Sequence, residues 1–235
     1  PDLAIEALDG ALAVLEYDED TQIRVLQRDD GREVVVVQAN AFNVSRLYVT
    51  GRPDGRRIDG YDSYFELVRE KVRAHKEEHG AAGGFAMDKE DWALLFAESY
   101  DRYLRYLFFS SLDRWADVKR DTDENLSVCA WAVRYAEEEM AWRVYQHKGY
   151  ILMMNSIARA ELALEDEDEP LADREIARGI DKIAAFCREC VLADHTDAEE
   201  LTREHYMANL RKYRAELVTD GRLEEASRED PRNVV

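Results

Sequence analysis

The sequence has no long apolar run, few cysteines and a small share of basic residues. No segment reaches the ~18 consecutive apolar residues of a membrane-spanning helix, so we expect no contact with the bilayer interior. Its first residues do not resemble a basic and apolar signal peptide. The 3 cysteines are an odd number in 235 residues and do not suggest a disulfide framework. These absences predict a soluble protein of the reducing cytoplasm.

Negative charge dominates the composition. The chain has 51 acidic and 32 basic side chains, which gives a net charge of −19. Nucleic acids and anionic membrane surfaces are bound through positive charge, so we expect neither of them to be a direct partner. The 46% of hydrophobic residues is ordinary for a globular protein and can fill a sizeable core. If the partner is a protein, the charge favours a basic one.

The pattern of the chain changes near residue 60. Before it, three β-prone runs at 21–28, 33–39 and 44–50 alternate with turn residues. The first turn contains Asp29, Asp30 and Gly31, and the second spans 51–55; glycine supplies the positive φ that a tight hairpin needs. We expect residues 1–60 to form a short helix around 3–15 followed by a three-stranded antiparallel meander.

After residue 60 the apolar period becomes that of helices. One helix follows Tyr61, others are expected over 89–112, 116–146, 150–165 and 171–192, and a last one runs from Asp197 to Leu217. Long helices with short polar connections pack as antiparallel neighbours. The predicted class is therefore α+β, predominantly α, with a helical domain over 61–220 and a polar, frayed tail over 221–235.

Two pairs of these helices resemble tetratricopeptide-type hairpins. They are 89–112 with 116–146, and 150–165 with 171–192. The segment "AELALEDEDEPLADREIARGIDKIAAF" (160–186) carries the resemblance best, because Ala177 and Gly179 allow close approach of its two helices. The helix starts near 89 and 150 lie about 60 residues apart, whereas that repeat has a period of about 34. The resemblance therefore implies hairpins that are longer than standard repeats.

Three stretches also resemble an uncharacterised bacterial family that joins a small N-terminal sheet to such hairpins. They are "TGRPDGRR" (50–57), "VKRDTDENL" (118–126) and "YILMMNSIARAELAL" (150–164). Some members of that family end in a UvrB/UvrC-type motif, from which "LTREHYMANLRKYRAEL" (201–217) departs. The resemblance implies the same order of sheet and hairpins, and it brings no catalytic motif.

The stretch "HKEEH" (75–79) has the H-x-x-E-H pattern of the inverzincin metallopeptidases. His75 and His79 project from one helical face and could bind zinc together, with Glu78 as a base. A third ligand would be needed near residue 154, where the sequence reads Met153, Met154, Asn155 and Ser156. We therefore interpret the pattern as a coincidence at the exposed end of a helix, and a zinc-dependent hydrolase stays an alternative.

The pair Cys187 and Cys190, followed by His195, offers a second candidate for metal or redox chemistry. Cys129 or His205 would have to supply the fourth zinc ligand, and no thioredoxin-like strand precedes the helix. Because the two cysteines continue an apolar stripe, we expect them to pack in the core. The acidic run 165–169 lacks the pattern of a calcium loop and is interpreted as a solvated turn.

The helices over 89–146 are rich in aromatic residues, which occupy more faces than one amphipathic stripe can bury. Tyr106 and Phe109 lie off the stripe of Phe96, Tyr103 and Leu107, so we expect them to be exposed partner contacts. The leading hypothesis is a non-catalytic protein-interaction or adaptor module with an acidic surface, an aromatic groove and no cofactor. The alternative is an acidic inhibitor or immunity-type protein that masks a basic partner.

Overall fold

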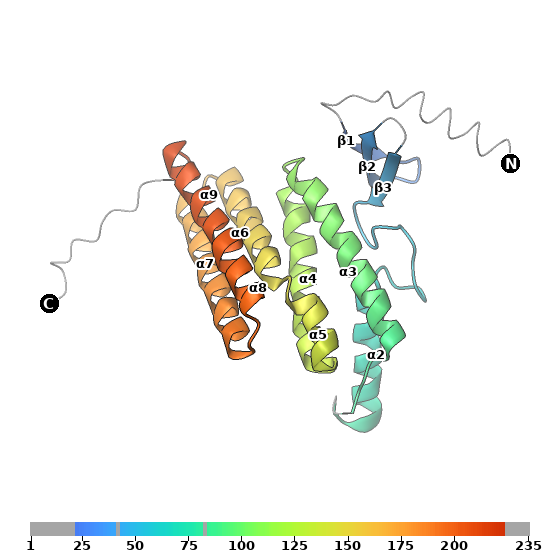
Figure 1. Cartoon of the computed structure of the whole chain (residues 1–235). Helices are drawn as coiled ribbons and strands as arrows, with labels where there is room; N and C mark the ends of the chain where they lie inside the picture. Colours follow the sequence, from blue (N-terminus) through green and yellow to red (C-terminus); the bar gives the residue numbers. More distant parts are fainter. Residues whose placement is uncertain (1–21, 41–42, 82–83, 224–235) are drawn as a thin grey trace. The chain divides into compact units, whose positions relative to one another are not determined.

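A computed structural model describes residues 22–40, 43–81 and 84–223 of the chain. A three-stranded antiparallel sheet is followed by helices, so the fold is α+β and predominantly α, as predicted (Figure 1). The helix expected around residues 3–15 and most of the expected tail, residues 224–235, lie outside the described residues.

The sheet has the predicted meander topology. Its strands β1 (Ile23–Gln27), β2 (Glu33–Asn40) and β3 (Asn43–Tyr48) are paired in sequence order. The first hairpin closes where expected, and the N–H of Gly31, at φ 79°, donates to the carbonyl of Arg28 at 2.9 Å. On one face, Val34, Val36 and Tyr48 form a small apolar cluster.

The turn that follows β3 depends on a glycine. Gly55 has φ +75°, a backbone conformation that residues other than glycine rarely adopt. It also lies against the ring of Tyr48, where an added Cβ would be 2.1 Å from Cε2. The predicted turn at 51–55 is thus fixed both by backbone conformation and by contact with the sheet.

Two helices belong with the sheet. Helix α2 (Tyr64–His79) starts at Ser63, whose side chain accepts a hydrogen bond from the N–H of Glu66, and it packs against α3 (Lys89–Ser110). The side chain of Arg105 on α3 donates to the carbonyls of Tyr48 and Gly51 at 2.7 and 2.8 Å. These bonds tie α3 to the end of the sheet.

The buried face of α3 is not the predicted one. Tyr106 and Phe109 are completely buried, so the expectation that they are exposed is wrong, and with it the reason for choosing them as partner contacts. Tyr100, which lies one helical turn from both Phe96 and Tyr103 of the predicted stripe, is 60% exposed. The reason is that the buried face also carries the charged residues Glu98 and Arg102, which pair with each other at 2.6 Å.

The remaining helices form a second compact unit. They are α4 (Trp115–Tyr135), α5 (Glu138–Tyr145), α6 (Lys148–Glu165), α7 (Glu169–Leu192), α8 (Thr196–Leu201), the π-helix η2 (Thr202–Met207) and α9 (Ala208–Thr219). The single helix predicted over 116–146 is wrong, because the extended backbone at Ala136 and Glu137 separates α4 from α5. This break turns the chain without a proline or a glycine.

Helices α6 and α7 form the closest hairpin of this unit (Figure 1). A Cβ at Gly179 would lie 2.2 Å from Oγ of Ser156, which confirms the predicted close approach at that glycine, whereas Ala177 is exposed. The acidic run between the helices is a turn, as expected. Its Asp168 caps α7 by accepting a hydrogen bond from the N–H of Leu171 at 2.9 Å.

The predicted boundary at residue 60 marks the change from strands to helices, whereas contacts between residues divide the chain after Leu112. Of the described residues, those up to Phe85 and those from Lys89 to Leu112 form one unit, and residues 86–88 and 113–223 form the other. Of the helices in the described part of the chain, none has both the length and the apolar character that crossing a bilayer requires.

Candidate functional site

The two histidines of the H-x-x-E-H pattern contact each other rather than converge on a point. The rings of His75 and His79 stack with centroids 4.3 Å apart, and Nδ1 of His79 donates to the carbonyl of His75 at 3.1 Å. The edge of Phe85 packs against His75, and Glu78 is exposed. Over residues 22–40, 43–81 and 84–223, no three histidine, cysteine, aspartate or glutamate side chains are gathered as a metal site would need.

The cysteines lie on the apolar side of α7, which confirms the predicted core packing. Cys187 and Cys190 are buried and free, together with Ile176 and Ile183 on the same stripe. Burial raises the pKa of the Cys187 thiol, and it raises the pKa of Cys190 to about 11. Both thiols are therefore protonated at neutral pH, which suits packing better than nucleophilic or metal chemistry.

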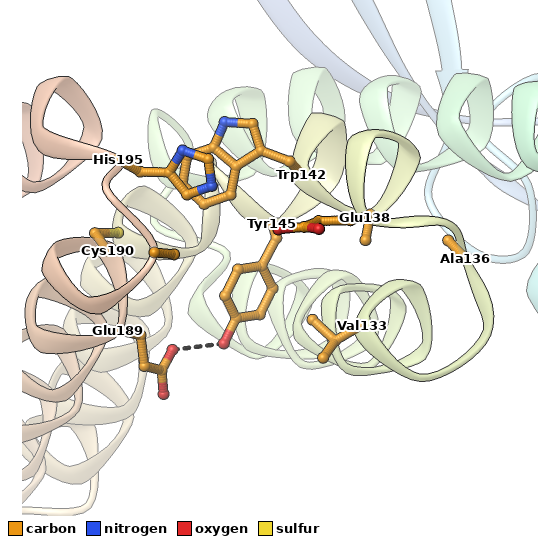
Figure 2. Close-up of a pocket in the computed structure, with 10 residues that line it drawn as sticks. Val133, Ala136, Glu138, Trp142, Tyr145, Glu189, Cys190 and His195 are labelled. Carbon is orange, nitrogen blue, oxygen red and sulfur yellow. Dashed lines mark hydrogen bonds between the residues drawn. The ribbon is translucent and has the colours of Figure 1, made fainter.

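The second unit carries two open hollows that share Trp142 and His195 as a wall. The first, of about 360 Å³, lies among α4, α5 and the end of α7 (Figure 2). The second, of about 400 Å³, extends along α8 to Tyr206. Each volume is near the lower end of the range for ligand sites, roughly 300 to 1,000 Å³. We call the first the α5/α7 hollow and the second the α8 hollow.

The shared wall is a stacked aromatic pair. Figure 2 shows the imidazole of His195 over the indole of Trp142. The ring centroids are 3.5 Å apart and the ring planes differ by 11°. The break after α4 starts α5 at Glu138, and the short α5 then carries Trp142 on its first turns. His195 comes from the other side, just after the end of α7.

A Schellman-type helix end places His195. Asp194 adopts φ 60°, its N–H donates to the carbonyl of Val191 at 3.2 Å, and the N–H of His195 donates to the carbonyl of Cys190 at 2.9 Å. Glycine normally occupies the left-handed position of this motif, so Asp194 holds a strained conformation at the rim of the α8 hollow. The reversal of the chain there is what brings the imidazole back over Trp142.

The floor of the α5/α7 hollow is fixed by three polar side chains. The hydroxyl of Tyr145 donates to the carboxylate of Glu189 at 2.5 Å, and Nζ of Lys148 contacts that hydroxyl at 2.6 Å and the carboxylate at 3.0 Å. Burial and the bond to Glu189 raise the pKa of the Tyr145 hydroxyl. A base would need the opposite shift, so we interpret the group as a clamp that joins α5, α6 and α7.

The far side of the α8 hollow is made by the π-helix η2. Its Tyr206 lines the hollow and packs edge-on against Tyr150, with centroids 5.4 Å apart. Its Thr202 presses on α6, because a Cβ at Gly149 would lie 2.7 Å from both Oγ1 and Cγ2 of Thr202. Single π turns inside helices are often found at functional sites.

Carboxylates surround the hollows. Glu138 and Glu189 line the α5/α7 hollow, and Asp194 and Asp197 line the α8 hollow; none of the residues that line either hollow is a lysine or an arginine. Exposed apolar side chains adjoin them. Val133 is 58% exposed on the first wall, and Leu192, 89% exposed, precedes the lining residue Ala193.

Sequence reasoning missed this site. The helix predicted over 116–146 includes Trp142 without a break, and the sequence suggests His195 only as a metal ligand. The one local signal is the polar stretch "ADHTD" (193–197), which ends the apolar stripe of α7 and marks a helix end. Comparison of the chain with protein-family models, with curated proteins and with solved structures finds no match.

Proposed function

We propose that the chain is a non-catalytic protein-interaction module, and that the hollows beside Trp142 form its surface for a basic protein partner. The observation that carries the proposal is the Trp142–His195 stack, which stands between two open hollows edged by carboxylates. Tryptophan is the residue type most enriched among the side chains that dominate binding energy at protein interfaces.

The negative charge of the protein and the apolar side chains of this surface have separate roles in binding. The net charge of −19 attracts a cationic partner over a distance and speeds association. The aromatic side chains and the neighbouring Val133 and Leu192 offer apolar area that a partner can bury, which slows dissociation. Salt should therefore reduce the association rate, because the Debye length falls from about 10 Å at 0.1 M to about 3 Å at 1 M. It should leave the dissociation rate nearly unchanged.

The test is a selection of displayed 12-residue peptides on the immobilised protein, followed by affinity measurements on labelled peptides. We expect Trp142→Ala to weaken binding about 30-fold, since truncation of such an anchor costs about 2 kcal/mol or more. Trp131→Ala is the matched control, because Trp131 is half-buried on α4 of the same unit, contacts Tyr135 and lines neither hollow.

Two results would overturn the proposal. One is a selection that yields no peptide above background. The other is a set of peptides that bind Trp142→Ala and the parent protein equally tightly. Circular dichroism of both tryptophan variants checks that the helices are retained.

A further inference from the structure

We propose that the partner presents one short segment in which an apolar side chain fills the α5/α7 hollow while a nearby arginine or lysine fills the α8 hollow. This inference rests on the proposed function and adds the chemistry of the ligand. Each hollow has room for a side chain rather than for a large cofactor, with about 360 and 400 Å³ respectively.

The α5/α7 hollow suits an apolar side chain. Its walls include Val133, Ala136, Ala141 and Ala193 beside the aromatic rings. The carboxylate of Glu189 on its floor already accepts hydrogen bonds from the Tyr145 hydroxyl and from Nζ of Lys148. A second cation there would compete with Lys148, whereas an apolar group would gain from leaving water.

The α8 hollow suits a cation. Besides the shared aromatic wall it is lined by polar groups, among them the exposed carboxylates of Asp194 and Asp197 and the amide of Gln146. The aromatic ring of Tyr206 on its lining can also attract a guanidinium or ammonium group, because the face of an aromatic ring is negative. A phosphate or a carboxylate would be repelled by the same two aspartates, so a nucleic acid or an acidic peptide does not fit.

The shared wall links the two preferences. Because Trp142 and His195 line both hollows, a segment that crosses the stacked pair reaches both with neighbouring side chains. Two anchors on one segment raise affinity together, since the second binds without a further loss of translational freedom. The ligand is therefore a short linear motif that combines one apolar and one basic residue, and not a uniformly basic surface.

Charge reversal gives a sharp test. Peptides selected on the parent protein should pair an apolar residue with a nearby arginine or lysine. Asp194→Lys with Asp197→Lys should weaken these peptides about tenfold, because each exposed ion pair contributes a factor of up to about five. A new selection on that variant should replace the basic residue by an acidic one and keep the apolar residue.

The matched control changes the net charge equally at the other end of α7. Glu165→Lys with Asp166→Lys alters two exposed residues of the α6–α7 turn, and we expect affinity to stay within about twofold at 0.15 M salt. Val133→Glu tests the other hollow, and it should remove the apolar preference while the basic preference remains.

The outcomes separate this inference from the proposed function. Peptides that need Trp142 but carry no basic residue would overturn the inference and leave the proposed function standing. So would an equal loss of affinity in the two charge variants, because it would show only a long-range effect of net charge. If no selected peptide depends on Trp142, both fall together.

Discussion

Replacing Glu98 with alanine would remove the centre of a buried polar cluster in the first unit. The carboxylate accepts hydrogen bonds from the backbone N–H groups of Tyr64 and Phe65 at 2.6 and 3.3 Å, at the start of α2. It also accepts from the guanidinium groups of Arg102 at 2.6 Å and Arg52 at 3.1 Å. The side chains of Glu98 and Arg102 are each only 1% exposed.

The size of the effect follows from these contacts. Removing one partner of a buried ion pair costs about 3–5 kcal/mol, because the remaining charge stays buried without compensation. Here Arg102 would lose its ion pair with Glu98, and two N–H groups at the start of α2 would lose their acceptor as well. We expect a loss of about 4 kcal/mol in the free energy of unfolding of the unit that holds the sheet, α2 and α3.

Hydrogen exchange followed by mass spectrometry can measure this loss for each unit separately. A loss of 4 kcal/mol speeds exchange of the protected amides of α2 and α3 by roughly 10³-fold, since 1.4 kcal/mol is a factor of ten. Glu77→Ala, on α2 of the same unit, is the control. Its exposed pair with Arg73, at 3.0 Å, should cost only about 0.3–0.5 kcal/mol.

Two further variants separate charge from hydrogen bonding. Glu98→Gln keeps the volume and one acceptor oxygen, so it should lose less stability than Glu98→Ala. Glu98→Leu with Arg102→Leu removes both charges and should cost less than the sum of the single changes, because no uncompensated charge remains. The reasoning would be refuted if Glu98→Ala cost no more than Glu77→Ala, or if the double variant were simply additive.

Three more predictions concern the second unit. Burial raises the pKa values of Cys190 and Cys129 to about 11 and about 12. We therefore expect iodoacetamide at pH 8 to label both thiols at least 100-fold more slowly in the native protein than in urea, and mass spectrometry can measure the two rates. Glu167 has φ 58° in the turn after α6, so Glu167→Gly should raise the free energy of unfolding by about 1 kcal/mol in urea titrations, and a loss would contradict this. Burial by itself raises the pKa of Asp123, but hydrogen bonds led by that from Arg159 outweigh it and hold the pKa below the ordinary 3.8. A carboxylate with a lowered pKa stabilises the fold at any pH above its unfolded-state pKa, and this stabilisation is lost as the pH falls through the folded-state pKa. Asp123→Asn should therefore reduce the free energy of unfolding at pH 7 and make that free energy fall less steeply below about pH 4.

The elements that local patterns determine could be predicted from the sequence. The strands follow from β-prone runs separated by turns, and Gly31 and Gly55 both have the positive φ that those turns require. The helices α6 and α7 follow from a clean apolar period with an acidic turn between them. In each of these cases the information lies within a few residues of the feature, which is why the pattern is enough.

The buried face of α3 could not be found in the same way. Glu98, Arg102 and Arg105 are buried on it, so an assignment based on apolar residues alone selects the neighbouring face. Their burial depends on partners far away in the sequence, such as the carbonyl of Tyr48 for Arg105. An assignment from apolar periodicity places every charged residue on the exposed face, so it is wrong where a charged residue is buried.

The candidate site escapes prediction for a related reason. It is built where three departures from regular helix meet: the break at Ala136 and Glu137, the left-handed Asp194, and the π-helix Thr202–Met207. Glu167 shows that a left-handed residue alone simply ends a helix, because the turn after α6 is closed by the same kind of backbone bonds. What distinguishes the region of Trp142 is that each departure borders one of the two hollows that share its ring: Ala136 lines the α5/α7 hollow, and Asp194 and Tyr206 line the α8 hollow. Local sequence and structure disagree most often where a protein uses a surface for something other than stability. The proximity of these departures therefore supports a functional surface there. The strain at Asp194 makes this testable: Asp194→Gly should raise the free energy of unfolding while lowering the affinity for a basic ligand.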